Sequence, residues 1–232
     1  MSEFFIGFAI LCGYFLICAL IAIICRKTLK IPDEVFRKIL HFILLGSVFT
    51  FTFAFKTWWI SALGSVIFML IVYPILLVAE KFKNYSKTVT ERKKGELKRS
   101  LLIVFSTFAV VIAIAWGLFG SEIIVLSSIL SWGIGDALAA LIGTKFGKRK
   151  IYKKKTLEGS LAMLCTSFLT LIIIFSIANL TTWYFSLLTS LIVAAAISAA
   201  ELYTPNGLDT LTCPLTSLFF TIGLLSLFGV LA

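Results

Sequence analysis

The chain has 232 residues, of which 60% are hydrophobic and 14% charged, and its mean hydropathy is +1.06. A soluble domain is nearer half apolar, so this composition excludes an ordinary water-soluble protein. The net charge is +10, from 21 Lys and Arg against 11 Asp and Glu. In a membrane protein, such an excess reflects either orientation in the bilayer or binding of an anionic ligand.

Eight apolar segments have the length that is needed to cross about 30 Å of hydrocarbon. They cover residues 4–25, 39–55, 57–79, 101–119, 123–143, 161–180, 184–203 and 211–232. The first has no basic region before it and no small-residue cleavage site, so we expect a retained span rather than a signal peptide. We therefore predict an all-α, polytopic membrane bundle of about eight helices, with seven to nine as the range.

All five cysteines lie in apolar stretches, without a CxxC pattern or clustering with histidine. We therefore expect buried, inert thiols and no disulfide framework. The cysteines are Cys12, Cys18, Cys25, Cys165 and Cys213.

Twenty of the 21 basic residues lie in three connections, those after the first, third and fifth segments. The opposite connections carry Lys56 alone, so the positive-inside rule predicts cytoplasmic basic connections and both termini outside. Residues 80–100 carry a net +5 and residues 144–160 a net +6. Such concentrations favour binding of phosphates or anionic head groups, and solvated loops at a negatively charged membrane face are the alternative.

One acid is predicted at membrane depth. Asp136 stands seven residues before the end of its segment, or about 10 Å at 1.5 Å per residue. A carboxylate there costs at least about 2.5 kcal/mol and normally has a functional reason. Gly133 and Gly135 should weaken the helix, and Ala140 and Gly143 share the Asp136 face and would let other helices approach. We expect the carboxylate to point into the bundle, and a structural ion pair with a lysine is the alternative.

Two further acids flank the last cytoplasmic connection. Glu201 ends a run of small residues at 194–200, and Asp209 follows after Pro205 and Asn206. This is the only cytoplasmic connection without a basic residue, so its acids need a cation from elsewhere. Mg²⁺ favours one or two carboxylates together with phosphates and would meet that need.

Glu158 lies where the sixth helix should begin, with Thr156 or Ser160 as its cap. It is a further candidate acid on the same side of the membrane. An ordinary N-terminal acid that complements the helix dipole is the alternative.

A small basic cluster lies at the cytoplasmic start of the second segment. Arg37, Lys38 and His41 share one helix face there, either as an anion clamp or as a solvated interfacial cluster. Glu96, in the basic connection at 80–100, is another acid close to the membrane surface.

All of these polar features are predicted on one side of the membrane. Phosphoryl or nucleotidyl transfer requires such groups: acids that can hold a metal, bases that can hold phosphates, and helix ends that supply N–H donors. The glycines and lysines at 143–149 do not form a P-loop, because the GxxxxGK[ST] spacing fails: position 142 is Ile and Lys148 is followed by Arg149.

The central block resembles the CTP-dependent lipid kinases, a family that includes dolichol kinase, phytol kinase and yeast-type diacylglycerol kinase. The matched pattern is Gly135-Asp136, Ala139-Ala140, Gly143, Phe146-Gly147-Lys148 and Lys155-Thr156-x-Glu158-Gly159-Ser160. Flanking similarity extends over about residues 37–215, at Arg37-Lys38-x-x-His41, Gly95-Glu96, Glu201 and Asp209 to Pro214. The late family motif usually reads Asp-Asn, where this chain has Asp209-Thr210.

The resemblance implies a transferase that moves the γ-phosphate of CTP to the hydroxyl of a membrane lipid alcohol, with Mg²⁺, at the cytoplasmic face. The alcohol would be dolichol or another polyprenol, phytol or geranylgeraniol, or diacylglycerol. The implied catalytic residues are Asp136, Asp209 and Glu201, and the implied metal ligands are Asp136, Glu158, Glu201 and Asp209. The implied nucleotide-binding residues are Lys145, Lys148, Arg149, Lys155, Thr156, Glu158 and Gly159. Further phosphate or substrate contacts would come from Arg37, Lys38, His41 and Glu96.

Asp136 could instead accept the proton of the alcohol, since the sequence does not separate a base from a metal ligand. The nearest alternative activity is that of a lipid cytidylyltransferase similar to the CDP-diacylglycerol synthases, whose C-terminal Lys-Asp and Asp-Arg-x-Asp signature has no equivalent here. A cation-coupled transporter would also explain intramembrane acids, but it predicts acids near the midplane and internal repeats.

We expect one membrane-embedded catalytic domain over residues 1–232. Its expected partners are the lipid alcohol, a nucleoside triphosphate and membrane lipids, with no nucleic acid. The expected location is the plasma membrane of a prokaryote, or the endoplasmic reticulum or plastid membrane of a eukaryote. The sequence does not indicate an oligomeric state.

Overall fold

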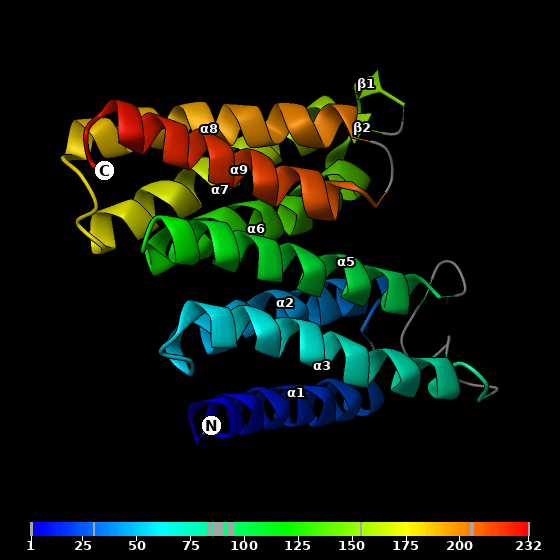
Figure 1. Cartoon of the computed structure of the whole chain (residues 1–232). Coiled ribbons are helices and arrows are strands. Elements are labelled where there is room, and N and C mark those ends of the chain that lie inside the picture. The colour runs from blue at the N-terminus through cyan, green and yellow to red at the C-terminus, as the bar shows by residue number, and fades with distance from the viewer. Residues whose placement is uncertain are drawn as a thin grey trace. The chain divides into compact units, whose positions relative to one another are not determined.

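The computed structural model describes residues 2–29, 31–82, 85, 91, 95–153, 155–204 and 207–231. The described chain is almost entirely helical (Figure 1), and eight of its helical segments are long and apolar enough to cross a membrane. They are α1 (Ser2–Thr28), α2 (Asp33–Phe53), α3 (Trp58–Ala79), α5 (Glu96–Val111) continued by the π-helix η1 (Ile112–Leu118), α6 (Glu122–Phe146), α7 (Leu157–Ile177), α8 (Trp183–Tyr203) and α9 (Asp209–Leu227). The prediction of an all-α polytopic membrane protein is confirmed.

Six helices extend further toward the predicted cytoplasmic side than the apolar segments do. Helices α2, α5, α7 and α9 begin two to six residues earlier than predicted, α1 ends at Thr28 instead of 25, and α6 ends at Phe146 instead of 143. The reason is that charged residues at helix ends lower the hydropathy, although the helix continues into the interface. Asp136 therefore lies ten residues from the end of α6, or about 15 Å along the helix.

Helix α6 runs without interruption through Gly133 and Gly135, so the expected weak point is absent from this helix. A glycine costs a helix about 1 kcal/mol, but neighbours can offset this cost where its missing side chain allows close packing. An added Cβ at Gly135 would lie 2.6 Å from the sulfur of Met163 and 2.7 Å from Oγ of Ser167, both on α7. Gly135 thus makes room for α7.

The chain divides into two compact units, residues 1–110 and residues 111–232. In the first, α1, α2, α3 and α5 contribute to a cluster of aromatic rings whose neighbouring centroids are 4.7–6.1 Å apart. Its members are Phe15, Phe51, Phe68, Phe105 and Phe108. Ser65 of α3 also donates a hydrogen bond to the carbonyl oxygen of Phe105 in α5, at 2.8 Å.

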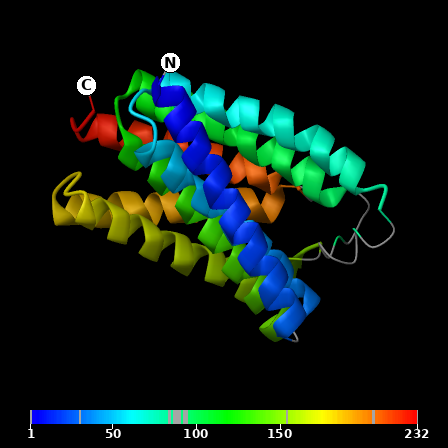
Figure 2. The ribbon, with the colours of Figure 1, turned by 90° about the horizontal axis from the view of Figure 1, so that it is seen from below.

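In the second unit, α6 is the most buried span and packs against α7 and α9, while α8 packs against α7 and α9. Figure 2 shows α7 and α8 side by side, in yellow and orange. Buried hydroxyls join the helices: Ser167 of α7 donates to the carbonyl oxygen of Ser131 at 2.9 Å, and Oγ of Ser131 lies 3.2 Å from Oγ of Ser217 in α9. In hydrocarbon, interhelical hydrogen bonds of this kind help to hold a bundle together.

A short hairpin connects α6 to α7, and the sequence analysis did not predict it. Strand β1 (Lys150–Tyr152) pairs antiparallel with β2 (Lys155–Thr156), and Tyr152 is the partner of Lys155. The strands have only three and two residues, with no apolar alternation, so no strand pattern is visible in the sequence. Lys150 and Lys155 lie in the two strands and Lys153 directly follows β1, while Lys154 is outside the described residues.

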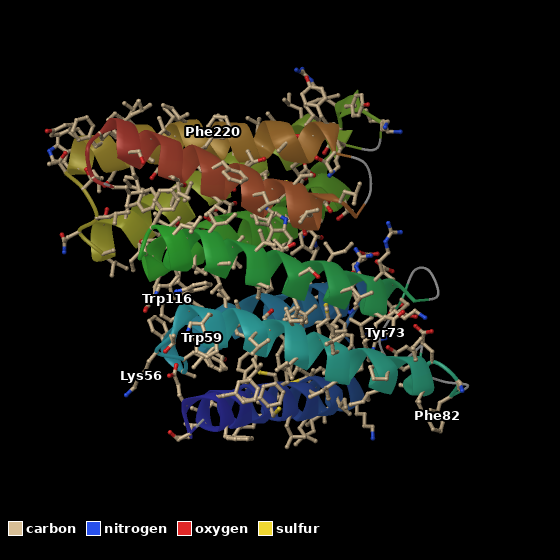
Figure 3. The ribbon with its side chains drawn as sticks, in the orientation of Figure 1. Lys56, Trp59, Tyr73, Phe82, Trp116 and Phe220 are labelled. Carbon is tan, nitrogen blue, oxygen red and sulfur yellow. The ribbon has the colours of Figure 1, made fainter. Side chains whose placement is uncertain are left out.

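Lys56, the single basic residue of the predicted outer connections, and the basic connection at 80–100 lie at opposite ends of helix α3. Figure 3 shows Lys56 and Trp59 near one end of α3 and Phe82 beyond its other end. This placement agrees with the predicted alternation of charge between the two membrane faces. Several residues named or counted in the sequence analysis lie outside the described residues: Lys30, Lys83, Lys87, Arg92, Lys93, Lys94, Lys154, Pro205 and Asn206.

The expectation of buried thiols is wrong for most of the cysteines. Cys12 and Cys165 are exposed, Cys18 and Cys25 are half-buried, and only Cys213 is buried. An apolar helix surface that faces lipid tolerates a thiol as readily as a protein core does, so an apolar sequence context does not separate the two environments. All five are free thiols.

Candidate active site

The candidate site of the second unit begins where α6 and α7 come closest together. An added Cβ at Gly159 of α7 would lie 3.1 Å from the carbonyl oxygen of Ala139 and 3.4 Å from Cα of Gly143, both on α6. The two backbones can approach this closely because neither Gly143 nor Gly159 carries a side chain. The prediction that Gly143 admits a neighbouring helix is confirmed, and the crossing brings the end of α6 beside the start of α7.

The start of α7 is capped as predicted. Thr156 is its N-cap residue, and its hydroxyl oxygen accepts a hydrogen bond from the backbone N–H of Gly159 at 3.2 Å. Gly147 ends α6 with an N–H that donates to the carbonyl oxygen of Gly143 at 3.2 Å, and a Cβ at Gly147 would collide with that oxygen. Thr156 and both glycines therefore position the connection between the two helices.

Glu158 holds the basic connection to the first turn of α7. Its carboxylate accepts a hydrogen bond from the backbone N–H of Arg149 at 3.4 Å, while the N–H of Leu157 donates to the carbonyl oxygen of Arg149 at 2.8 Å. These contacts agree with the alternative interpretation of Glu158 as an acid of the helix N-terminus. Its role as a metal ligand stays a prediction.

Three of the predicted nucleotide-binding bases are solvent-exposed. Lys145 is in the last turn of α6, and Lys148 and Arg149 follow directly in the connection. Exposed cations on one short connection can reach an anion from solvent at little cost in desolvation. They are therefore placed as phosphate-binding residues would need to be.

The fourth predicted base, Lys155, is partly buried and forms an ion pair with Glu201 of α8. The Glu201 side chain is only 5% exposed, and the Lys155 side chain is 27% exposed. The sequence indicated that the acids of the last connection need a cation from elsewhere, and for Glu201 the structure supplies Lys155. Burying a carboxylate at this depth is tolerable when such a partner neutralises it.

Two more acids approach Glu201 from other helices. Asp136 of α6 and Asp209, the first residue of α9, are within electrostatic range of both Glu201 and the buried thiol of Cys213. The Asp209 carboxylate also accepts a hydrogen bond from the backbone N–H of Thr210 at 2.9 Å. The structure thus brings together three predicted acids from three helices, on the side of the bundle where Lys155 lies.

These acids do not form a complete metal site by themselves. Within the residues that the structure describes, no three His, Cys, Asp or Glu side chains form a group that could hold a metal ion. Mg²⁺ needs no such cage, because it usually binds one or two carboxylates together with substrate phosphates and water. The donor set therefore fits a magnesium ion that arrives with a nucleotide.

The remaining predicted site residues belong to the first unit. Arg37 of α2 pairs with Glu34 at 2.7 Å and with Glu96 of α5 at 3.8 Å. Lys38 is 9% exposed, and His41 is half-buried with its ring 6.1 Å from that of Phe42. The structure thus brings Glu96 to the Arg37 cluster, which the sequence could not indicate. Arg37 already has carboxylate partners, so an anion would share it with them.

The first unit also contains a buried ion pair that the sequence analysis missed. Lys98 of α5 contacts Glu80, at the end of α3, at 2.8 Å, and the Glu80 side chain is 8% exposed. Near them, burial and the charges of Glu91 and Glu80 raise the pKa of Tyr85 to about 12. The Tyr85 phenol therefore stays protonated at neutral pH.

A second pair of residues in the 111–232 unit was also missed. The rings of Tyr152 in β1 and Tyr203 at the end of α8 have centroids 5.8 Å apart. Each tyrosine flanks a residue group that the sequence analysis had singled out, namely the basic connection and Glu201. The sequence pattern that could have indicated this pair is the presence of a tyrosine beside each of these two groups.

No protein-family model and no solved structure matches this chain. Among curated proteins, a phytol kinase of Synechocystis sp. is 28% identical in an alignment of 194 residues that covers 80% of this chain and 77% of the relative. Because neither compact unit is that long, the matched region includes parts of both.

Proposed function

We propose that this protein is a membrane-embedded lipid kinase that transfers the γ-phosphate of CTP to the hydroxyl of a lipid alcohol. The similarity to a phytol kinase supports the lipid kinase activity, and the resemblance of the central block to CTP-dependent lipid kinases supports the donor. The observation that carries the proposal is that Glu201 of α8 pairs with Lys155 of the basic hairpin and has Asp136 of α6 and Asp209 of α9 within electrostatic range. The proposal includes both units as one catalytic domain.

The basic connection would hold the triphosphate. Lys145, Lys148 and Arg149 are exposed and lie next to the N-terminal end of α7, where the helix dipole favours anions. Lys155 would reach a phosphate after leaving Glu201. Positioning and charge neutralisation supply most of the catalysis in phosphoryl transfer, so a site of this composition suffices for the reaction.

Asp136 and Asp209 would hold the magnesium ion of the nucleotide, because they come from two different helices and both lie within electrostatic range of Glu201. When bound, Mg²⁺ would neutralise the negative charge of the phosphates. The alcohol oxygen would attack the γ-phosphorus while the bond from that phosphorus to the β-phosphate oxygen breaks, releasing CDP. The hydroxyl proton would pass to a carboxylate. In the alternative assignment, Asp136 is that base, because it lies deepest along its helix, and Asp209 holds the metal.

The lipid substrate would reach the site from within the bilayer. Nearly all of the described chain consists of spans, and Glu201 and Asp209 lie at the ends of α8 and α9, while Asp136 lies about 15 Å from the end of α6. A long alcohol places its hydroxyl at the membrane surface and its chain in the hydrocarbon, which suits that position. We propose that this end faces the cytoplasm, as the positive charges predict.

The decisive experiment uses CTP labelled at the α or the γ position. Purified protein in detergent is mixed with Mg²⁺ and with phytol, geranylgeraniol, a polyprenol or diacylglycerol, and the extracted lipid is counted. A kinase transfers label from γ-labelled CTP only. Label from α-labelled CTP alone would instead identify a cytidylyltransferase, and solute uptake into vesicles without nucleotide would identify a transporter.

The identity of the donor and of the alcohol follows from the same assay. γ-Labelled ATP, GTP and UTP replace CTP at equal concentration, and each alcohol is compared at equal mole fraction in the detergent micelle. We expect CTP to be the best donor. Equal transfer from ATP would remove CTP dependence from the proposal but leave the kinase activity.

A further inference from the structure

Two tyrosines lie beside the ion pair of the candidate site. Tyr152 in β1 and Tyr203 at the end of α8 contact each other edge to face, with ring planes 61° apart. Their exposed fractions are 37% and 67%, so most of the Tyr203 ring faces outward. Rings this exposed bury little surface in their mutual contact, so the open face of Tyr203 is accessible to a ligand.

The hairpin register places the ring contact next to the ion pair. Tyr152 is the cross-strand partner of Lys155, and cross-strand partners extend their side chains to the same face of a hairpin. On the other side of the contact, Tyr203 lies two residues beyond Glu201. The pairs Tyr152–Tyr203 and Lys155–Glu201 are therefore two separate links between the hairpin and the last turn of α8, where Figure 1 shows the hairpin.

This arrangement combines an aromatic surface with positive charge. The ammonium group of Lys153 lies 5.0 Å from the centroid of the Tyr152 ring, and Lys148 and Arg149 are exposed in the same connection. Proteins that bind single-stranded nucleic acid without sequence preference combine these two elements, with stacking for the bases and cations for the phosphates. Each base has a π-face, so stacking is tolerant of base identity.

We infer that Tyr152 and Tyr203 form a stacking platform for the nucleobase of the nucleoside triphosphate. The inference rests on the proposed function, because it takes the basic connection as the phosphate site. The Tyr203 ring offers the more open face, and Tyr152 holds that ring in place through the edge-to-face contact. The platform increases affinity for the nucleoside part of the ligand and leaves the choice among bases to other contacts.

The test compares two ligands that differ by the nucleoside. The full-length protein in detergent is titrated with CTP and with inorganic tripolyphosphate, which carries the phosphates without ribose or base. For Tyr203→Ala we expect the dissociation constant of CTP to rise roughly tenfold, because one base–aromatic stack is lost. The dissociation constant of tripolyphosphate should not change. Tyr203→Phe keeps the ring and should bind CTP as the unmodified protein does.

Tyr184 provides a matched control. It is 49% exposed and stands in the first turn of α8, at the end opposite to Tyr203. An aromatic ring at a helix end is also typical of a membrane interface, and both tyrosines share that property. Tyr184→Ala should therefore leave CTP binding unchanged.

Three outcomes would overturn the platform. If Tyr203→Ala weakens CTP and tripolyphosphate equally, Tyr203 acts by positioning the hairpin. If it weakens neither, or if Tyr184→Ala has the same effect, the ring is an interfacial anchor. Failure of the kinase proposal would give a different result. If the protein binds CTP through Tyr203 but phosphorylates no lipid alcohol, the stacking platform is supported and the kinase proposal is wrong.

Discussion

Lys155 in strand β2 and Glu201 in helix α8 form an ion pair, although they are 46 residues apart in the sequence. The pair joins the basic connection to the acids of the candidate site. In this pair, the positive charge of Lys155, a predicted phosphate-binding residue, neutralises the negative charge of Glu201, a predicted metal ligand. Binding of a phosphate by Lys155 would require Lys155 to leave Glu201, so ligand binding would break this contact.

Because Lys155 and Glu201 form an ion pair, the effects of substituting them on the stability of the protein should not be additive. Lys155→Met and Glu201→Gln should each lower the free energy of unfolding by about 1–3 kcal/mol, because each leaves a partly buried partner without its counter-charge. In the double variant, the loss should be smaller than the sum by roughly 1 kcal/mol. Thermal unfolding in detergent measures all three variants. Lys148→Met, at an exposed position, is the control, and strictly additive losses would show that the pair is not coupled.

Asp136 should be required for activity but not for folding. Asp136→Asn should lower the rate of lipid phosphorylation at least roughly 100-fold, since it removes a carboxylate at the proposed metal and base position while keeping its shape. Size-exclusion chromatography and thermal unfolding should match the unmodified protein. Asp33→Asn is the matched control, because Asp33 is 76% exposed and pairs with Arg26 in the first unit. Retained activity in Asp136→Asn would exclude Asp136 from the site.

The sequence predicted the features that depend on local composition. The eight spans follow from apolar length, and the Thr156 cap follows from a hydroxyl residue three positions before Gly159. Helix ends were less accurate because Asp33 and Glu96 lower hydropathy without ending a helix. The partner of Glu201 could not be predicted, because a five-residue pairing of strands brings Lys155 to α8 and leaves no periodic signal. For the same reason the Tyr152–Tyr203 contact appears only in three dimensions.

The close approach of α6 and α7 should make Gly159 sensitive to the smallest side chain. Gly159→Ala should lower the free energy of unfolding by about 1 kcal/mol or more, because its Cβ would lie 3.1 Å from the carbonyl oxygen of Ala139 and force the helices apart. Gly223→Ala in α9 is the control. No atom lies within 4 Å of an added Cβ at Gly223, so alanine should be neutral or stabilising there. A Gly159→Ala variant as stable as Gly223→Ala would contradict the tight crossing.

The predicted orientation of the site can be tested with a membrane-impermeant thiol reagent. In a variant that lacks the five natural cysteines, Lys150→Cys and Lys56→Cys introduce single exposed thiols on opposite predicted faces. We expect the reagent to label Lys150→Cys in inside-out vesicles and Lys56→Cys in right-side-out vesicles, because positively charged connections stay in the cytoplasm. Solubilised vesicles should label both, which controls for accessibility. The reverse pattern would place the basic connection outside, away from cytoplasmic nucleotide, and would contradict the kinase proposal as well as the orientation.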